Sequence, residues 1–180
     1  MRKITAGTFL SLDGIAGAPE TWHFPYFNDE MGAVVQAQMA ASDTMLLGRH
    51  TYEAFAAYWP QSEDAFAGHM NSTPKLVVST TLERAEWQNS TVIGGDDPLA
   101  ELARLKEKPG KNLAVTGSLT LVRSLLRAGL LDELHLLVHP VIVGSGKRLF
   151  AGDGRIPLRL AGSTTLSTGV LSLVYTPDGA

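Results

Sequence analysis

Apolar residues recur along this chain with two different periods, and the change from one period to the other predicts the secondary structure. Short runs rich in β-branched and apolar residues predict strands at 4–12, 45–47, 76–78, 91–93 and 113–115. Apolar residues spaced three or four positions apart predict helices at 31–39, 52–59, 98–108 and 119–128. Residues 61–74 are weakly patterned and read as a loop that can hold one short helix.

After about residue 130 the pattern changes, because strand follows strand. Residues 134–138, 141–143, 158–161 and 170–175 have the composition of strands, and Thr168-Gly169 favours a hairpin turn. Strands that alternate with helices form parallel sheets, whereas consecutive strands pair antiparallel. The order therefore predicts an α/β fold with a mixed, mostly parallel sheet and an antiparallel C-terminal edge. With no repeat or linker, we expect residues 1–180 to form a single domain.

Composition and charge exclude several classes of function. The 180 residues carry a formal net charge of −3 and contain no cysteine. Without a cluster of Lys and Arg we expect no nucleic-acid partner, and without cysteine we exclude thiolate catalysis and Cys-based zinc sites. No run approaches the roughly 20 apolar residues of a membrane helix, so we expect no membrane partner. The sequence is typical of a cytoplasmic protein that acts on a small molecule.

Three predicted strands run directly into short turns that are rich in hydrogen-bond donors. The turns are Gly48-Arg49-His50-Thr51, Ser79-Thr80-Thr81 and Thr116-Gly117-Ser118. Ligands of open α/β sheets bind beyond the carboxyl ends of the strands. Arginine offers a fork that matches phosphate, and the start of a helix offers free N–H groups. Each turn alone is compatible with an ordinary cap or turn, but the three together predict a phosphate-bearing cofactor.

Other candidate motifs are weaker. Gly144-Ser145-Gly146-Lys147 lacks the third glycine of a dinucleotide fingerprint and the ending of a P-loop. His135 and His139 would lie about 13 Å apart on a strand, too far to share one ion, so we expect no metal site. Asp29 is most simply a carboxylate in the first turn of a helix, with a proton-relay role as the alternative.

Several stretches resemble the dihydrofolate reductase superfamily. The stretches are Ser11-Leu12-Asp13-Gly14, Gly48-Arg49-His50-Thr51-Tyr52-Glu53 and Val77-Val78-Ser79-Thr80-Thr81-Leu82. A later block is similar to the C-terminal reductase domain of the bifunctional riboflavin-biosynthesis deaminase–reductase and to its stand-alone bacterial relatives. That block runs from Leu131-Asp132-Glu133-Leu134 through Pro140-Val141-Ile142-Val143-Gly144 to Leu149-Phe150. The resemblance covers nearly the whole chain and implies a three-layer α/β/α fold with a sheet of about eight strands.

The resemblance also implies NADPH as the hydride donor. The residues that match positions for the adenosine 2′-phosphate and a neighbouring phosphate are Arg49, Thr51, Ser79 and Thr80, together with Gly48 before them. The residues that match the turn for the pyrophosphate are Gly117, Ser118, Leu119 and Thr120. Ala16, between Ile15 and Gly17, matches the mobile loop beside the nicotinamide.

The substrate half of the family pattern has diverged in this chain. Folate reductases carry a carboxylate where this chain has Phe27, so Asp29 becomes the first candidate for the proton donor, with bound water as its competitor. Riboflavin-pathway reductases carry an acidic residue where this chain has Thr116. We expect the substrate to be bounded by Asp13, Trp22 and Thr116, with Asp29 beside it.

The sequence therefore predicts an NADPH-dependent reductase similar to 5-amino-6-(5-phosphoribosylamino)uracil reductase, acting on a small pyrimidine- or pteridine-type substrate. A true dihydrofolate reductase and a nucleotide-binding module without efficient catalysis are the alternatives. The many apolar residues of the terminal strands predict a homodimer.

Overall fold

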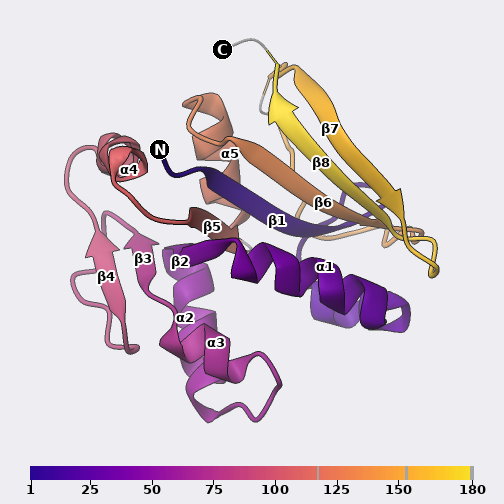
Figure 1. Ribbon diagram of the computed structural model, residues 1–180, viewed down its shortest axis with the longest axis horizontal. Helices are drawn as coiled ribbons and strands as arrows, with labels where there is room; N and C mark the ends of the chain where they lie inside the picture. Colours follow the sequence, from indigo (N-terminus) through magenta and orange to yellow (C-terminus); the bar gives the residue numbers. More distant parts are fainter. Residues whose placement is uncertain (117, 153, 179–180) are drawn as a thin grey trace.

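A sheet of eight strands runs through the middle of the molecule (Figure 1). The computed structural model describes residues 1–116, 118–152 and 154–178. The strands are β1 (Ile4–Ser11), β2 (Ser42–Gly48), β3 (Lys75–Val78), β4 (Ser90–Ile93), β5 (Asn112–Thr116), β6 (Glu133–His139), β7 (Leu158–Thr165) and β8 (Leu171–Pro177). Their order across the sheet is β4-β3-β2-β5-β1-β6-β8-β7.

Pairing from β4 across to β6 is parallel throughout, and β8 pairs antiparallel with both β6 and β7. The predicted fold class, a mostly parallel sheet with an antiparallel C-terminal edge, is confirmed. Because β5 lies between β1 and β2, the winding direction of the chain reverses there, and such a reversal is where open α/β sheets bind ligands.

The helices cover both faces of the sheet. They are α1 (Asp29–Ala40), α2 (Arg49–Tyr58), α3 (Ala67–Ser72), α4 (Pro98–Glu107) and α5 (Leu119–Arg127), with single 3₁₀ turns at Pro19–Thr21, Phe24–Tyr26 and Trp59–Gln61. One core cluster joins α4 and α5 to one face, and two smaller clusters join α1, α2 and α3 to the other. Among the described helices, none is long and apolar enough to cross a bilayer.

Local sequence explains where these helices begin. The Asn28 side chain accepts a hydrogen bond from Met31 N at 3.0 Å and so caps α1. Asp97 caps α4 in the same way through Ala100 N, with Pro98 in the first turn. The predicted short helix in residues 61–74 is present as α3.

The predicted strand at 141–143 is wrong. Pro140 has no N–H to continue the β6 ladder. Two backbone amides further along the segment donate to the side chain of Asp13 and not to a neighbouring strand. Val143 N and Gly144 N donate to the Asp13 carboxylate at 3.1 and 2.8 Å. Residues 141–144 therefore form an irregular segment held against the end of β1.

Candidate active site

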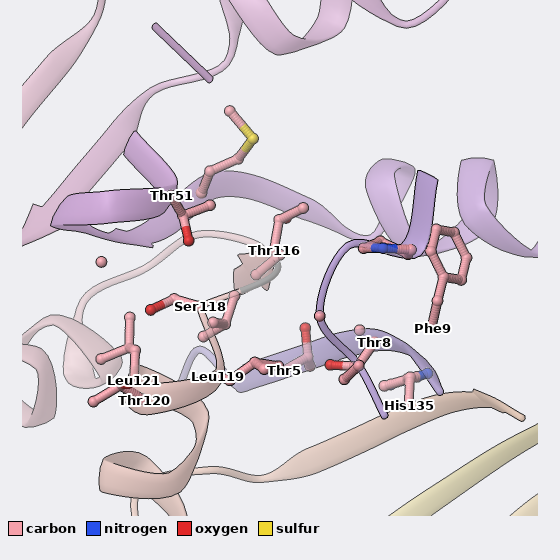
Figure 2. A pocket seen from close by; sticks show the side chains of 18 of the residues that line it. Thr5, Thr8, Phe9, Thr51, Thr116, Ser118, Leu119, Thr120, Leu121 and His135 are labelled. Carbon is pink, nitrogen blue, oxygen red and sulfur yellow. The ribbon is translucent and has the colours of Figure 1, made fainter. Parts of the chain in front are cut away.

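A cavity of about 1940 Å³ opens where the carboxyl ends of β2, β5 and β1 meet the first turns of α2 and α5 (Figure 2). Pockets for one small ligand usually measure about 300–1000 Å³. This cavity is large enough for a dinucleotide and a second molecule together. It continues along the sheet beneath α1 and is closed on one side by the segments 16–22 and 143–148.

Two helix N-termini lie side by side at the cavity. Gly48 precedes α2 and has no side chain to cap it, and the side chain of Ser118, which precedes α5, makes no capping hydrogen bond. A Cβ placed on Gly48 would run into Ser118 Oγ, so the two caps approach closely. The first-turn N–H groups and the positive ends of both helix dipoles are therefore directed at one place. Figure 2 shows Thr51, Thr116 and Ser118 around this opening.

Arg49 adds a cation beside the two helix ends. Its guanidinium donates to Thr81 Oγ1 at 3.1 Å and lies 3.8 Å from the Glu53 carboxylate. Ser79 Oγ accepts hydrogen bonds from Thr81 N at 3.2 Å and from Leu82 N at 3.0 Å. In the turn after β3, the Ser79 side chain thus stabilises the turn, and the Thr81 side chain binds the Arg49 guanidinium.

The structure brings most of the predicted cofactor residues together, but not all of them. Those that line the cavity are Ala16, Gly48, Arg49, Thr51, Ser118, Leu119 and Thr120. Buried Ser79 and exposed Thr80 are not among the described residues that line it. Gly117 lies outside the described residues. The sequence placed Thr81 in the donor-rich turn after β3, but its hydrogen bond with Arg49 joins residues 32 positions apart and has no local signal.

The loop predicted to lie beside the nicotinamide is bound to the Gly-Ser-Gly-Lys segment. Ala16 N and Gly17 N both donate to Lys147 O, at 2.9 and 3.0 Å. A Cβ on Gly17 would lie 2.9 Å from Lys147 Cβ, so only glycine allows this approach. Residues 145–148 also line the cavity and bring Lys147 and Arg148 to its mouth.

The predicted substrate residues divide into two groups. Trp22 and Thr116 line the cavity, and the indole N–H of Trp22 donates to Gly17 O at 3.2 Å. Asp13 instead faces the 141–148 segment. Hydrogen bonds from Ser11 Oγ, Val143 N and Gly144 N lower the pKa of Asp13 to about 2. Both oxygens of its carboxylate therefore already accept hydrogen bonds from the protein.

Asp29, the predicted proton donor, lies on the surface in the first turn of α1 and outside the cavity. Packing of Met31 against the sheet orients α1, so that Val34, Val35 and Gln38 face the cavity instead.

Two histidines are buried in an aromatic cluster next to Trp22. His23 stacks on Phe9 with ring centroids 4.6 Å apart, and His139 contacts Trp22 edge-on at 5.2 Å. Burial lowers the pKa of both histidines. Within the described parts of the chain, no group of three or more His, Cys, Asp or Glu side chains is placed to hold a metal ion.

The chain belongs to the family described as the RibD C-terminal domain, whose model matches residues 2–172. An uncharacterized protein of Bacillus subtilis, YyaP, is 34% identical over 143 residues, which are 76% of this chain and 75% of YyaP.

Several solved structures share the fold. A candidate riboflavin biosynthesis protein from Shewanella sp. PV-4 superposes with a TM-score of 0.76 at 18% identity, covering 98% of this chain and 99% of the other. The Thermotoga maritima diaminohydroxyphosphoribosylaminopyrimidine deaminase/5-amino-6-(5-phosphoribosylamino)uracil reductase gives 0.70 at 14% identity, covering 98% of this chain and 57% of the other. Enterococcus faecalis dihydrofolate reductase complexed with NADP(H) gives 0.66 at 13% identity, covering 98% and 97%. The fold is therefore dihydrofolate reductase-like, as the sequence predicted.

Proposed function

We propose that this protein is an NADPH-dependent reductase that transfers hydride to a small pyrimidine- or pteridine-type substrate. The observation that carries the proposal is the meeting of two uncapped helix N-termini, at Gly48 and Ser118, with the Arg49 guanidinium in one cavity. Such a cluster of donors fits a ligand with several phosphate groups. Membership of the RibD C-terminal domain family supports the same conclusion.

The residues around the cavity fit the parts of NADPH. The first turn of α5, at Ser118, Leu119 and Thr120, would hold the pyrophosphate, and Arg49 with Thr51 would hold the 2′-phosphate. Ala16 would lie beside the nicotinamide, which supplies the hydride when the cofactor is bound. The protein would bind and orient the two reactants and exclude water from them.

The substrate would occupy the part of the cavity beneath α1, next to Trp22 and Thr116. Bound water is the better proton source in this arrangement, because Asp29 lies outside the cavity. A true dihydrofolate reductase remains the alternative enzyme, and turnover of dihydrofolate would identify it. Phe27 argues against it, since an aromatic ring cannot relay a proton.

Titration of NADPH and NADH by fluorescence tests the proposal. We expect NADPH to bind more tightly than NADH, and Arg49→Ala to weaken NADPH binding about 10- to 100-fold while leaving NADH little changed. That range corresponds to the loss of a hydrogen bond to a charged group, about 1.5–3 kcal/mol.

Arg84→Ala is the matched control, because the Arg84 side chain is 83% exposed and pairs only loosely with Glu86 at 3.7 Å. If neither nucleotide binds the unmodified protein, the reductase assignment is wrong. If both nucleotides bind but no candidate substrate is reduced, the protein is a nucleotide-binding module.

A further inference from the structure

Part of the sheet face beneath α1 carries polar side chains where a helix usually covers apolar ones. Thr5 and Gly7 of β1 face α1, and so do Glu133 and His135 of β6. Gln38 of α1 faces them across the cavity. Figure 2 shows His135 on the strand next to Thr5 and Thr8. A polar floor inside a cavity is what a polar ligand requires.

Strand register places three of these residues in one row across the sheet. Gly7 is paired with Thr116 on β5 and with His135 on β6. Paired residues point to the same face, so Thr116 and His135 flank Gly7. Their backbones are two strand spacings apart, about 10 Å. Because Gly7 has no side chain, the floor between them leaves an opening, which the Gln38 amide occupies.

Gln38 lies directly over this opening. Its Oε1 is 2.7 Å from the position that a Cβ on Gly7 would occupy. Gln38 follows Met31 by seven positions and therefore continues the inward stripe of α1. The Gln38 amide and the Thr116 hydroxyl have no hydrogen-bond partner within the described part of the chain, so both remain available to a ligand.

Glu133 fixes the orientation of His135. His135 Nε2 lies 3.0 Å from Glu133 Oε2, and Lys3 Nζ lies 2.6 Å from Glu133 Oε1. Burial raises the pKa of Glu133, but the hydrogen bonds from Lys3 and His135 outweigh burial and hold that pKa below its usual range. A carboxylate only accepts, so Nε2 carries the proton that is donated. Nδ1 of His135 is left without a partner among residues 1–116, 118–152 and 154–178.

We propose that Gln38, Thr116 and His135 form a row that recognises the hydrogen-bonding edge of a planar nitrogen heterocycle, with Glu133 as the residue that positions His135. The amide and the hydroxyl each donate and accept, and Nδ1 accepts from a ring N–H or an exocyclic amino group. This inference rests on the proposed function, since it assigns the substrate end of the same cavity.

Histidine NMR with 2-amino-4-oxopteridine and 2,4-diaminopyrimidine as probes tests the inference on the unmodified protein. We expect each probe to shift the imidazole signals of His135, identified by their loss in His135→Gln. The shift of His135 is compared with the shifts of the other four histidines in the same spectra. NADPH is titrated into the same samples, and the probes are added both with and without it.

Variants then separate recognition from general damage. We expect His135→Phe and Gln38→Leu to weaken probe binding about tenfold or more, because each leaves a polar group of the bound probe without its hydrogen-bond partner. We expect NADPH affinity to stay within about twofold, and Glu133→Gln to reduce probe affinity less than His135→Phe. Arg159→Ala, on the far edge strand β7, is the control.

Two results would overturn the inference. One is that neither probe binds at millimolar concentration, and the other is that the probes bind without shifting His135 and with equal affinity in both variants. Failure of NADPH to bind would instead contradict the proposed reductase, and the probe titration without nucleotide would still test the polar floor.

Discussion

Gly48 shows how one residue sets the distance between two helix ends. Its backbone, at φ −79° and ψ 159°, is open to any residue. Glycine is needed for a different reason, because a side chain at this position would meet Ser118 Oγ. The close approach of α2 and α5 depends on that missing atom.

Gly48→Ala tests this dependence. We expect NADPH binding to weaken about tenfold, because the methyl group must displace the Ser118 hydroxyl from its place at the start of α5, and overpacking typically costs about 1–3 kcal/mol. Gly68→Ala is the control, since a Cβ on Gly68 meets nothing within 4 Å and alanine favours the helix. Equal affinity in the two variants, measured by fluorescence titration, would contradict the assigned role of Gly48.

Some site residues could be predicted from the sequence and others could not. Arg49 comes directly after β2 and Ser118 lies two positions after the end of β5, and this local position is enough to direct them to the cavity. Asp13 has partners at Val143 and Gly144, about 130 positions later, so no local pattern shows them. Gln38 is a polar residue that interrupts the apolar stripe of its helix, and this indicates a position that could face a ligand. A residue that faces solvent explains the same pattern equally well until the sheet face beneath the helix is known.

At the scale of elements, the site depends on two loops that bind each other. The segment after β1 and the segment after β6 are joined by main-chain bonds at Ala16 and Gly17 and by the Asp13 carboxylate. The pKa of Asp13 is about 2, below its ordinary value of 3.8. The ionised carboxylate therefore stabilises the folded protein above about pH 4, and this contribution is lost as the pH falls toward 2.

Asp13→Asn should remove this contribution. We expect a lower Tm than that of the unmodified protein at pH 7, and we expect the difference to shrink as the pH falls from about 4 toward 2. Thermal unfolding followed by circular dichroism at several pH values measures it. Glu63→Gln, at an exposed position, should leave the Tm unchanged. A difference between the Asp13 variant and the unmodified protein that does not vary with pH would contradict the role of the charge.

Secondary structure was predictable where its signals are local. The caps at Asn28 and Asp97 and the stripe of α5 are all local, and their helices begin as expected. Residues 141–143 have the composition of a strand, but the Asp13 carboxylate takes the amides of Val143 and Gly144. A tertiary contact thus overrides the β propensity of that segment.

At the scale of the whole molecule, β7 and β8 form an edge that extends beyond the helices (Figure 1). β7 pairs with β8 on one side and has no strand partner on its other side within the described chain. Leu160 is 50% exposed and Leu171 is 39% exposed on this ribbon. An open edge with exposed apolar side chains favours association with a second copy.

We expect the protein to sediment as a homodimer at micromolar concentration, and Leu160→Glu to shift it toward monomer. Analytical ultracentrifugation measures both states. Tyr58→Glu, at an exposed position on α2, is the control and should leave the dimer intact. A monomeric unmodified protein would exclude the dimer.

The sheet type was predictable from the order of elements, whereas the position of β5 was not. Alternation of strands and helices indicates parallel pairing, but it does not say which strands become neighbours. The order of the strands depends on how the helices pack on the two faces of the sheet. α4 and α5 share one core on one face, and α1, α2 and α3 contribute to two smaller cores on the other.

The position of β5 has a consequence for the order in which the molecule folds during synthesis. Among the described strands, β1 pairs with β5 and β6 alone, so this strand has no neighbour until residues 112–116 have left the ribosome. Pairings between distant segments slow folding, because the chain loses the entropy of closing a long loop before the contacts of the paired strands stabilise it. The cavity at the carboxyl ends of β1, β2 and β5 therefore assembles late, and until then the nascent chain carries an unpaired strand that chaperones can bind.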